Sequence, residues 1–409
     1  MGTPVSGQYD AVVVGAGPAG SATAALLARR GFSVLLLDRA AFPRDKACGE
    51  YTSPETEQVL KRIGVLEPVL RAGARRLPAM KVISPSGCSF TMQYSRECHS
   101  DEAHVIATPR RILDATLVDH ARRCGVCVQE REKVEGVVLR DGKAAGVTLR
   151  SRSGGSQEVR ARLVIGADGV HSAVVRSLGL EAPLRWPRNL GMVAHYQGHN
   201  GLDAWGEMHV SAKGYAGLAP LSDGLLNVGL VMPMTRNKAG SEGSAAARFE
   251  SFANSFPGVR ERLAGAERVS QVRGVGPIGV RVRCSYGAGY LLVGDAAGFF
   301  DPFTGEGVYK ALRGAELAAE VASEALEKND LSSRALSRYA RLRRRHFAAK
   351  EMVCRLVQLF VAFPPAMDYI AARLPNRPTP LNTITGVLGD FADPRAALSP
   401  TFLWSLLRP

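Results

Sequence analysis

The sequence has few cysteines, no long apolar run and a shortage of acidic residues. Its seven cysteines are an odd number, and Cys124-Gly125-Val126-Cys127 is a lone CxxC motif with no second pair. Neither a structural zinc site nor a disulfide framework is expected, so we expect a reducing, cytoplasmic compartment. The start, Met1 to Tyr9, lacks the charged and apolar regions of a secretory signal. No apolar run reaches the roughly 18 residues typical of a transmembrane helix.

The remaining composition is that of a globular protein with excess positive charge. Hydrophobic residues make up 46% of the 409 residues and charged residues 22%, which argues against disordered, collagen-like and coiled-coil chains. The length predicts two or three domains of roughly 100–200 residues. The 52 Lys and Arg against 38 Asp and Glu leave a net charge of +14. Such a balance fits nucleic acid, an anionic membrane surface, acidic substrates or simple solubility.

Two kinds of sheet are predicted to alternate along the chain. Short apolar runs near residues 10, 35, 165 and 291 are typical of buried parallel strands, and a helix over 18–30 follows the first run. Alternating segments over 76–108 and 190–231 are typical of antiparallel strands. Helices are predicted over 110–123, over 307–326 and in the region after residue 330.

The strongest motif is Gly15-Ala16-Gly17-Pro18-Ala19-Gly20, which follows a predicted strand and opens a predicted helix. Gly15 permits the tight turn, Gly17 lets a pyrophosphate approach the backbone, and Gly20 lets the helix pack on the strand. Asp38 ends the second strand, where it can accept hydrogen bonds from ribose hydroxyls, and Arg39 is a neighbouring candidate. The same pattern at 274–279 has no strand–turn–helix around it, so we interpret it as chance.

Two further motifs indicate which dinucleotide is bound. Asp168-Gly169 and Gly294-Asp295 each follow a predicted strand, and the segment 301–307 opens the long helix. An aspartate at the carboxyl end of a parallel strand can accept hydrogen bonds from a polyol chain such as ribityl. A glycine-rich helix start can stabilise negative charge on a flavin ring.

With these motifs in this order, the chain resembles FAD-dependent enzymes of the para-hydroxybenzoate hydroxylase-like group, and within it the geranylgeranyl reductase branch. The similarity covers about residues 9–330. It implies that Arg110, in the helix start Arg110-x-x-Leu113-Asp114, contacts FAD, that Asp168 supports the cofactor region and that Asp295 holds the ribityl chain. The full predicted cofactor set is Gly15, Gly17, Pro18, Ala19, Gly20, Asp38, Arg39, Cys48, Gly49, Arg110, Asp168, Gly294, Asp295, Pro302, Gly305, Glu306 and Gly307.

The predicted fold class is therefore α/β, with a Rossmann-like FAD-binding domain, an interleaved antiparallel-sheet substrate domain and a C-terminal helical region. The FAD-binding domain is predicted over 1–75, 109–182 and 281–330. The substrate domain is predicted over 76–108 and 183–280, and the helical region over 331–409.

The branch is indicated by the segment 42–50, in which Lys46-Ala47-Cys48-Gly49 looks like the reductase-type loop beside the flavin. Halogenases of the same group usually carry a Gly-Glu-Ser segment and a Trp-x-Trp-x-Ile-Pro element. This chain has the segment 215–220, Tyr-Ala-Gly-Leu-Ala-Pro, near where that element would fall, so halogenation is not predicted. The reductases often have an aromatic residue near Gly217, and here the chain departs from them.

Cys48 is the predicted catalytic residue, because its thiol is the acid-capable group that the resemblance puts near the flavin, and Lys46 would favour the thiolate. The alternative is a small wall residue. Glu50 is a second catalytic candidate, as a base, against a salt-bridged carboxylate. Tyr51, Tyr215 and Gly217 are the predicted substrate pocket, the tyrosines alternatively being core aromatics. His195 and His199 share strand parity, but we expect no metal site.

The predicted reaction is reduction of carbon–carbon double bonds in a lipophilic small molecule, with NAD(P)H or ferredoxin as the reductant. An FAD-dependent monooxygenase that hydroxylates a lipophilic or aromatic substrate through a flavin hydroperoxide is the alternative, because one fold hosts both reactions. A lipid or flavin carrier without turnover is a third interpretation, and the Gly294-Asp295 and 305–307 segments argue against it. The oligomeric state is left open.

The positive charge is concentrated near the end of the chain. Residues 330–409 contain 12 Lys and Arg and 5 Asp and Glu, a net of +7, and five arginines lie between 338 and 345. The apolar segment 356–367 follows. A basic face beside an apolar segment predicts contact with an anionic membrane surface, against the alternative of a solvated helix face. Nucleic acid is not expected as a partner, because no recognised binding motif accompanies the arginines.

Overall fold

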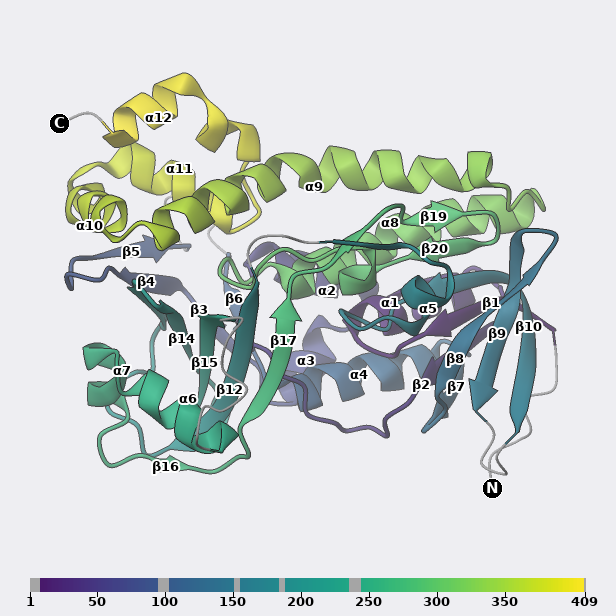
Figure 1. Ribbon diagram of the computed structural model, residues 1–409, viewed down its shortest axis with the longest axis horizontal. Coiled ribbons are helices and arrows are strands. Elements are labelled where there is room, and N and C mark those ends of the chain that lie inside the picture. Colours follow the sequence, from purple (N-terminus) through teal and green to yellow (C-terminus); the bar gives the residue numbers. More distant parts are fainter. Residues whose placement is uncertain (1–7, 95–102, 151–154, 184–187, 235–243, 408–409) are drawn as a thin grey trace.

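A computed structural model describes residues 8–94, 103–150, 155–183, 188–234 and 244–407. Figure 1 shows two sheet-based units side by side, joined along the top by one long helix, α9 (Ser333–Ala362). The N-terminus lies beside the first sheet, and the C-terminus lies in a group of helices over the second sheet.

The first sheet has a parallel centre. β20 (Tyr290–Leu292), β10 (Ser156–Gly166), β1 (Gln8–Val14), β2 (Val34–Asp38) and β7 (Cys127–Glu130) are its parallel strands, in that order. β19 (Tyr286–Gly287), β9 (Lys143–Arg150) and β8 (Val134–Arg140) extend it with antiparallel pairs. The central strands are rich in Val, Leu and Ile because both of their faces are covered.

Helices and a hairpin cover the two faces of this sheet. Ala11 and Val13 of β1 face a core built with α1 (Pro18–Ala28), α8 (Gly307–Glu327) and the first half of α9. Val12 and Val14 alternate to the other face, toward the β8–β9 pair and α5 (Ala173–Ser177). α4 (Arg110–Arg123), α2 (Glu55–Ile63) and α3 (Leu66–Arg71) pack around α1 and α8.

The second sheet is mostly antiparallel. Its order is β16 (Glu267–Arg268), β12 (Asn189–Gln197), β15 (Leu225–Pro233), β14 (Gly214–Pro220), β13 (Gly206–Ser211), β4 (Ala79–Ile83) and β5 (Ser89–Gln93), and β17 (Arg273–Ile278) also pairs with β12. Two short pairs lie outside both sheets, β3 (Arg75–Leu77) with β6 (Val105–Ala107) and β11 (Glu181–Ala182) with β18 (Arg281–Val282).

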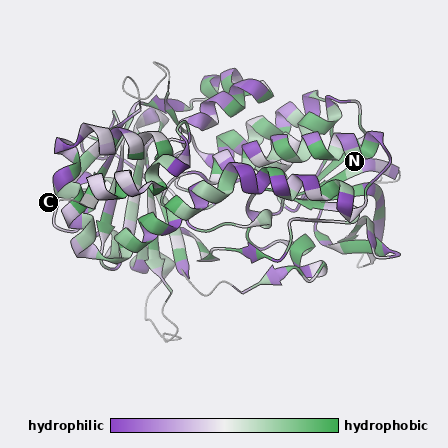
Figure 2. Cartoon of the chain, turned by 90° about the horizontal axis from the view of Figure 1, so that it is seen from above, coloured by the Kyte–Doolittle hydropathy of each residue, from purple (hydrophilic) through white to green (hydrophobic). Residues whose placement is uncertain are grey.

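Two groups of helices cover the second sheet. α6 (Ala245–Ala253) and α7 (Pro257–Arg262) pack on one face. The second half of α9, with α10 (Pro364–Arg373), α11 (Pro378–Leu388) and α12 (Pro400–Leu407), shares a core with the other face. Seen from above, this C-terminal group presents pale and green residues beside purple ones (Figure 2). Short 3-10 turns lie at Ser222–Gly224, Gly294–Ala297, Leu374–Asn376 and Pro394–Leu398.

The predicted fold class is confirmed, and the segment limits stay a prediction. Three details differ from the sequence-based expectation. β10 begins at Ser156, well before the short apolar run expected near residue 165, because its first half pairs with β9 at the sheet edge. β4 pairs in parallel with β13 inside the antiparallel sheet. The C-terminal region is divided between the two cores. The second glycine pattern, 274–279, lies along β17 and its end, without a strand–turn–helix.

Candidate functional site

The glycine turn between β1 and α1 is shaped for a close ligand. A Cβ on Gly15, which has φ +99°, would lie 2.5 Å from the Ala167 carbonyl oxygen, and one on Gly20 would lie 1.8 Å from the Gly15 carbonyl oxygen. Neither position therefore accepts a side chain. A Cβ on Gly17 would meet only the guanidinium nitrogens of Arg44 and Arg110, at 3.8 and 3.9 Å. Gly17 thus opens onto two cations, as a pyrophosphate requires.

Asp38 fixes this turn from the end of β2. Its Oδ2 accepts a hydrogen bond from the Ala16 N–H and its Oδ1 accepts one from the Ala40 N–H, both at 2.8 Å. A carboxylate has about four acceptor positions, so positions remain for sugar hydroxyls. Arg39 beside it is exposed at the rim.

Three cavities follow one another from this turn toward the C-terminal helices. The polar cavity, about 810 Å³, is lined by Gly15, Asp38, Arg39 and Asp168 together with several basic residues. The central cavity, about 210 Å³, lies between the two sheets, and the apolar pocket, about 160 Å³, lies under the C-terminal helices. Gly17, Lys46 and Ala167 line both the polar and the central cavity. The central cavity and the apolar pocket share Gly49, Tyr51, Met208, Gly217, Pro302 and Gly305.

Most predicted cofactor residues line the first two cavities. The central cavity is walled by Gly17, Pro18, Ala19, Cys48, Gly49, Arg110, Gly294, Asp295, Pro302, Gly305 and Gly307. Gly20 acts through packing. Glu306 lines none of the three cavities, because its carboxylate is buried against Lys310, and its predicted cofactor role has no support from its contacts.

Arg110 begins α4 and points into the central cavity. Its guanidinium donates two hydrogen bonds of 2.8 Å to the Asp114 carboxylate, one helical turn later. This bidentate contact fixes the guanidinium plane. Arg44 approaches the same carboxylate at 3.2 Å, so one buried anion orients two cations toward Gly17.

Asp168 is engaged by the start of α5, whose N-cap is Ser172, and is not a free acceptor. Its Oδ1 accepts from the Ser172 hydroxyl at 2.5 Å and its Oδ2 accepts from the Ala173 N–H at 2.6 Å, at the start of α5. Burial raises the pKa of its carboxyl, and these hydrogen bonds oppose that shift. Asp168 thereby shapes the wall of the polar cavity, which agrees with a supporting role.

The two predicted catalytic residues lie in different surroundings. Cys48 lines the central cavity, where its Sγ accepts a weak hydrogen bond from the Glu50 N–H at 3.4 Å. Glu50 lines none of these three cavities. Its Oε1 accepts from the Arg110 backbone N–H and its Oε2 lies against His195 Nε2, both at 2.7 Å. Both oxygens are occupied, so the contacts support a structural tie between α4 and β12 and not a base.

The three predicted pocket residues all lie on cavity walls. Tyr51 and Gly217 line both the central cavity and the apolar pocket, and Tyr215 lines the central cavity. Tyr51 donates its hydroxyl hydrogen bond to the Ala79 carbonyl at 2.9 Å, and Tyr215 donates to Asp301 Oδ1 at 2.6 Å. Burial raises the pKa of both phenols well above the usual value. Whether they touch a substrate stays a prediction.

Several features of the site were not predicted from the sequence. Lys46 reaches both the polar and the central cavity, and burial, with the nearby Arg110 charge, lowers the pKa of its ammonium. Asp301 is buried, and burial raises its pKa to about 6. The position of Asp301 inside the segment 301–307 was the only available signal. The Glu50–His195 pair, whose members lie 145 residues apart, left no local pattern.

The prediction that His195 and His199 lie on the same face of one strand is wrong. β12 ends at Gln197 and Gly198 has φ +75°, so the strand alternation stops before His199. Among the described residues, no group of three His, Cys, Asp or Glu side chains is placed to hold a metal ion.

Comparisons with known proteins identify the family of the chain. The profile of the FAD binding domain family matches residues 8–355. A digeranylgeranylglycerophospholipid reductase of Methanococcoides burtonii is 31% identical over 340 residues, which span 81% of this chain and 78% of the relative.

Solved structures show the same fold. A geranylgeranyl bacteriochlorophyll reductase-like protein of Thermoplasma acidophilum superposes with a TM-score of 0.79 at 24% identity, over 96% of this chain and 98% of that one. A flavin-dependent brominase gives 0.80 at 21% identity, over 94% of each chain. At these identities the two structures establish the fold alone.

Proposed function

The chain belongs to the FAD-dependent oxidoreductases, in their geranylgeranyl reductase branch, and on that premise we propose that it reduces carbon–carbon double bonds in the isoprenoid chain of a lipid. The observation that carries the proposal is the apolar pocket, which lies next to the central cavity and shares six lining residues with it. A flavin ring in the central cavity would therefore face a long apolar chain in the pocket.

The lining of the apolar pocket fits a hydrocarbon chain. β4, β5, β13 and β14 supply one wall and α9 to α12 supply the other. No charged residue of the described chain lines it, and its polar side chains are the hydroxyls of Tyr51, Thr52, Ser53, Tyr94 and Thr304. Each buried CH₂ contributes about 0.8 kcal/mol, so a five-carbon isoprene unit contributes up to about 4 kcal/mol. Binding is therefore expected to depend mainly on chain length.

Saturating a double bond requires a hydride at one carbon and a proton at the other. FAD, when bound and reduced, supplies the hydride. Cys48 is the proposed proton donor, because its Sγ lies on the central cavity wall beside Gly49, which also borders the apolar pocket. Arg110 and Lys46 bind and orient anionic groups, and the apolar pocket excludes water.

The proposed reductant is NAD(P)H or ferredoxin, which would bind transiently and without a domain of its own. The second glycine pattern lies along β17 in the substrate sheet, so it supplies no dinucleotide turn among the described residues. Anaerobic reduction of the flavin by each donor separates these two sources. Rapid reduction by NADPH without an added redox protein supports the nicotinamide.

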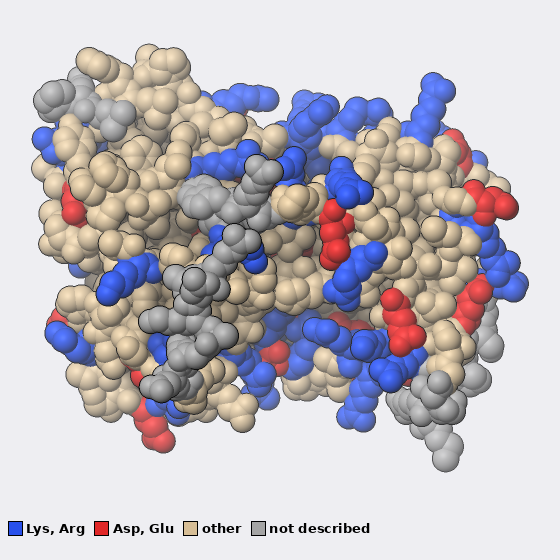
Figure 3. Space-filling model, in the orientation of Figure 1, with Lys and Arg blue, Asp and Glu red and all other residues tan. Residues whose placement is uncertain are grey.

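We propose that the membrane contact lies at the apolar end of the C-terminal helices. Met352, Leu359, Phe363 and Trp404 are 47, 56, 60 and 70% exposed there. Leu356, Phe360 and Leu403, each within three residues of one of these in the sequence, line the apolar pocket. Figure 3 shows a mostly uncharged surface at the upper left, over these helices. A lipid could pass from a bilayer into the pocket along this surface.

Some of the five arginines between residues 338 and 345 already have partners within the protein. Arg338 forms ion pairs with Glu320 and Glu324 of α8, and Arg343 lies over the rings of Tyr339 and Phe347. We therefore propose insertion of the apolar end as the main membrane contact, in place of the basic face. No single described helix is long and apolar enough to cross a membrane; α9 and the segment 364–376 pass that test only as a pair bent by 106°.

Product analysis under oxygen-18 gas tests the proposed reaction against hydroxylation. Purified holoenzyme, a reductant and a geranylgeranyl lipid are incubated with oxygen-18 and, separately, without oxygen. We expect two added hydrogens per double bond and full anaerobic turnover. A labelled product that forms only with oxygen would establish the monooxygenase instead. Cys48→Ser is expected to retain FAD and lose turnover.

A further inference from the structure

Helix α9 carries a buried polar stripe in its second half. Lys350, Cys354 and Gln358 are spaced by four residues, which places them on one helix face. They are 3, 4 and 5% exposed. Polar groups so deeply buried require partners, and all three find them in the segment 301–307, which we call the flavin loop because Pro302, Gly305 and Gly307 line the central cavity.

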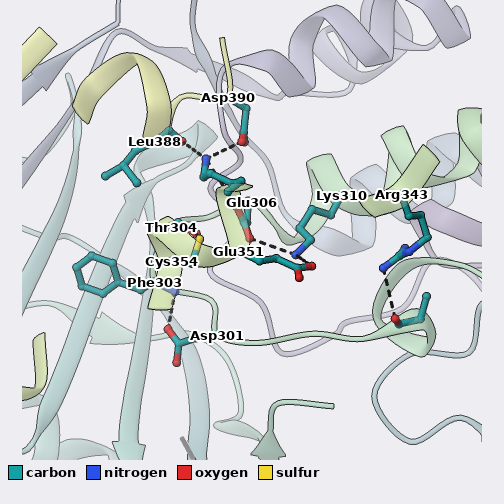
Figure 4. A network of polar contacts seen from close by, with 12 residues as sticks. Asp301, Phe303, Thr304, Glu306, Lys310, Arg343, Glu351, Cys354, Leu388 and Asp390 are labelled. Carbon is teal, nitrogen blue, oxygen red and sulfur yellow. Dashed lines mark hydrogen bonds and ion pairs between the residues drawn. The ribbon is translucent and has the colours of Figure 1, made fainter. Parts of the chain in front are cut away.

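The three residues contact the flavin loop at regular intervals. Gln358 Nε2 donates a 2.6 Å hydrogen bond to Asp301 Oδ1. Cys354 Sγ lies 3.6 Å from the Thr304 hydroxyl, and Lys350 Nζ lies 3.6 Å from Glu306 Oε2. Figure 4 shows Cys354 beside Thr304 and Glu306, with Asp301 nearby. One face of one helix therefore contacts the loop at both ends and in the middle.

Asp301 connects this stripe to the cavity wall. Its Oδ1 also accepts from the Tyr215 hydroxyl at 2.6 Å and from the Phe303 N–H at 3.0 Å. Three donors therefore converge on one oxygen, and Tyr215 lines the central cavity. Loss of the Gln358 donor would let the carboxylate and the Tyr215 ring shift together.

The neighbouring face of α9 contacts the other site. Val353, Leu356, Val357 and Phe360 line the apolar pocket. A chain that fills the pocket must therefore press on the same two helical turns whose polar face contacts the flavin loop. Packed interiors transmit such displacements, because they have little free volume.

Lys350 ties a further pocket wall to the same point. Its Nζ donates to the Val387 carbonyl at 2.7 Å and to Asp390 Oδ1 at 2.6 Å, at the end of α11. Ile384 and Leu388 of α11 line the apolar pocket. Removing one partner from a buried charged group is strongly unfavourable, so α11, α9 and the loop are held together.

We propose that α9 couples filling of the apolar pocket to the flavin loop, with Lys350, Cys354 and Gln358 as positioning residues. The inference rests on the proposed function only in placing a flavin in the central cavity and an apolar chain in the pocket. The proposal predicts that the oxidation state of the flavin changes the affinity for the chain. Linkage then requires that a bound chain changes the flavin potential by the matching amount.

The test measures binding of hexadecanol, a saturated chain that cannot be reduced, to oxidised and to dithionite-reduced holoenzyme. Couplings of this kind are typically about 5-fold or more, so we expect the two dissociation constants to differ at least that much. Gln358→Leu should bring the ratio close to one while the flavin stays bound. Ala348→Gln, which adds an amide at an exposed position of the same helix, should keep the wild-type ratio.

An unchanged ratio in Gln358→Leu would overturn the inference, as would equal affinities in the wild type or no binding of hexadecanol. If Gln358→Leu does not fold, Cys354→Val removes the thiol that contacts Thr304 and Glu306 and is expected to lower the ratio; an unchanged ratio there overturns the inference. Turnover with a geranylgeranyl lipid separates the two claims. If the wild type turns over the lipid but Gln358→Leu leaves the ratio of dissociation constants unchanged, only the coupling is refuted. If Gln358→Leu changes that ratio but the wild type shows no turnover, only the reductase function is refuted.

Discussion

Replacing Asp301 by asparagine should remove a pH dependence that this buried carboxyl imposes on folding stability. Asp301 is 5% exposed, and burial raises its pKa from the ordinary 3.8 to about 6. The folded protein therefore keeps this proton at pH values where the unfolded chain has released it. Asparagine keeps the shape and an oxygen that accepts from Tyr215 and Gln358 but has no proton to release.

The size and sign of the effect follow from the shift. A difference of about two pKa units at roughly 1.4 kcal/mol each amounts to about 3 kcal/mol. Because the folded state binds more protons between the two pKa values, the contribution is fully present below about pH 4 and is lost as the pH rises through about 6. The free energy of unfolding of the wild type minus that of the variant should therefore be about 3 kcal/mol smaller above about pH 6 than below about pH 4.

Urea unfolding of both proteins, at several pH values between about 4 and 7 and with the same excess of FAD, measures this difference. Subtracting the variant's free energy of unfolding from that of the wild type cancels the contributions of groups that titrate identically in both proteins. The reasoning predicts a difference that falls with pH and then levels off. A flat difference, or one that rises with pH, would refute the assignment of a raised pKa to Asp301.

Three further outcomes are expected. Cys48→Ser should retain FAD but slow reoxidation of the reduced flavin by substrate about 10²- to 10⁴-fold, measured by stopped flow; a wild-type rate removes the thiol from the mechanism. Gly20→Ala should abolish FAD retention on gel filtration, because its Cβ would overlap a carbonyl oxygen; full occupancy would show that the turn relaxes. Leu359→Asp with Phe363→Asp should lower co-sedimentation with lipid vesicles, while Arg344→Gln should have the smaller effect; the reverse order would restore the basic face as the main contact.

The elements that were predictable are those whose signal is local. The glycine turn, Asp38 and the amphipathic helix over 110–123 each combine spacing with neighbouring pattern, and all three lie where they were expected in the fold. Their contacts with a cofactor stay a prediction. Their geometry depends on backbone approach within one βαβ unit, which the glycine positions report directly.

The site contacts that were missed depend on long-range pairing. Glu50 has the local pattern of an exposed or catalytic acid, and its partner His195 comes from a strand of the other sheet. Gln358 and Asp301 are 57 residues apart. Nothing in the sequence near either residue indicates which polar group is buried with which, because that is decided when α9 docks on both cores.

The charge pattern was informative about position but not about role. Five arginines in one helix predict a surface, yet Arg343 donates to the Ala297 carbonyl and stacks on two aromatic rings of its own helix. The stems of such residues pack on apolar surface, which a count of charges does not register. The exposed apolar residues near Phe363 became visible only once the buried face of α9 was known.

The most direct test of the reductase assignment is a single anaerobic turnover. Holoenzyme reduced with one equivalent of dithionite is mixed with a geranylgeranyl lipid, and flavin absorbance and product mass are followed together. The assignment predicts flavin reoxidation at the rate at which a product with two added hydrogens appears. A flavin that stays reduced until oxygen is admitted, followed by an oxygenated product, would contradict it.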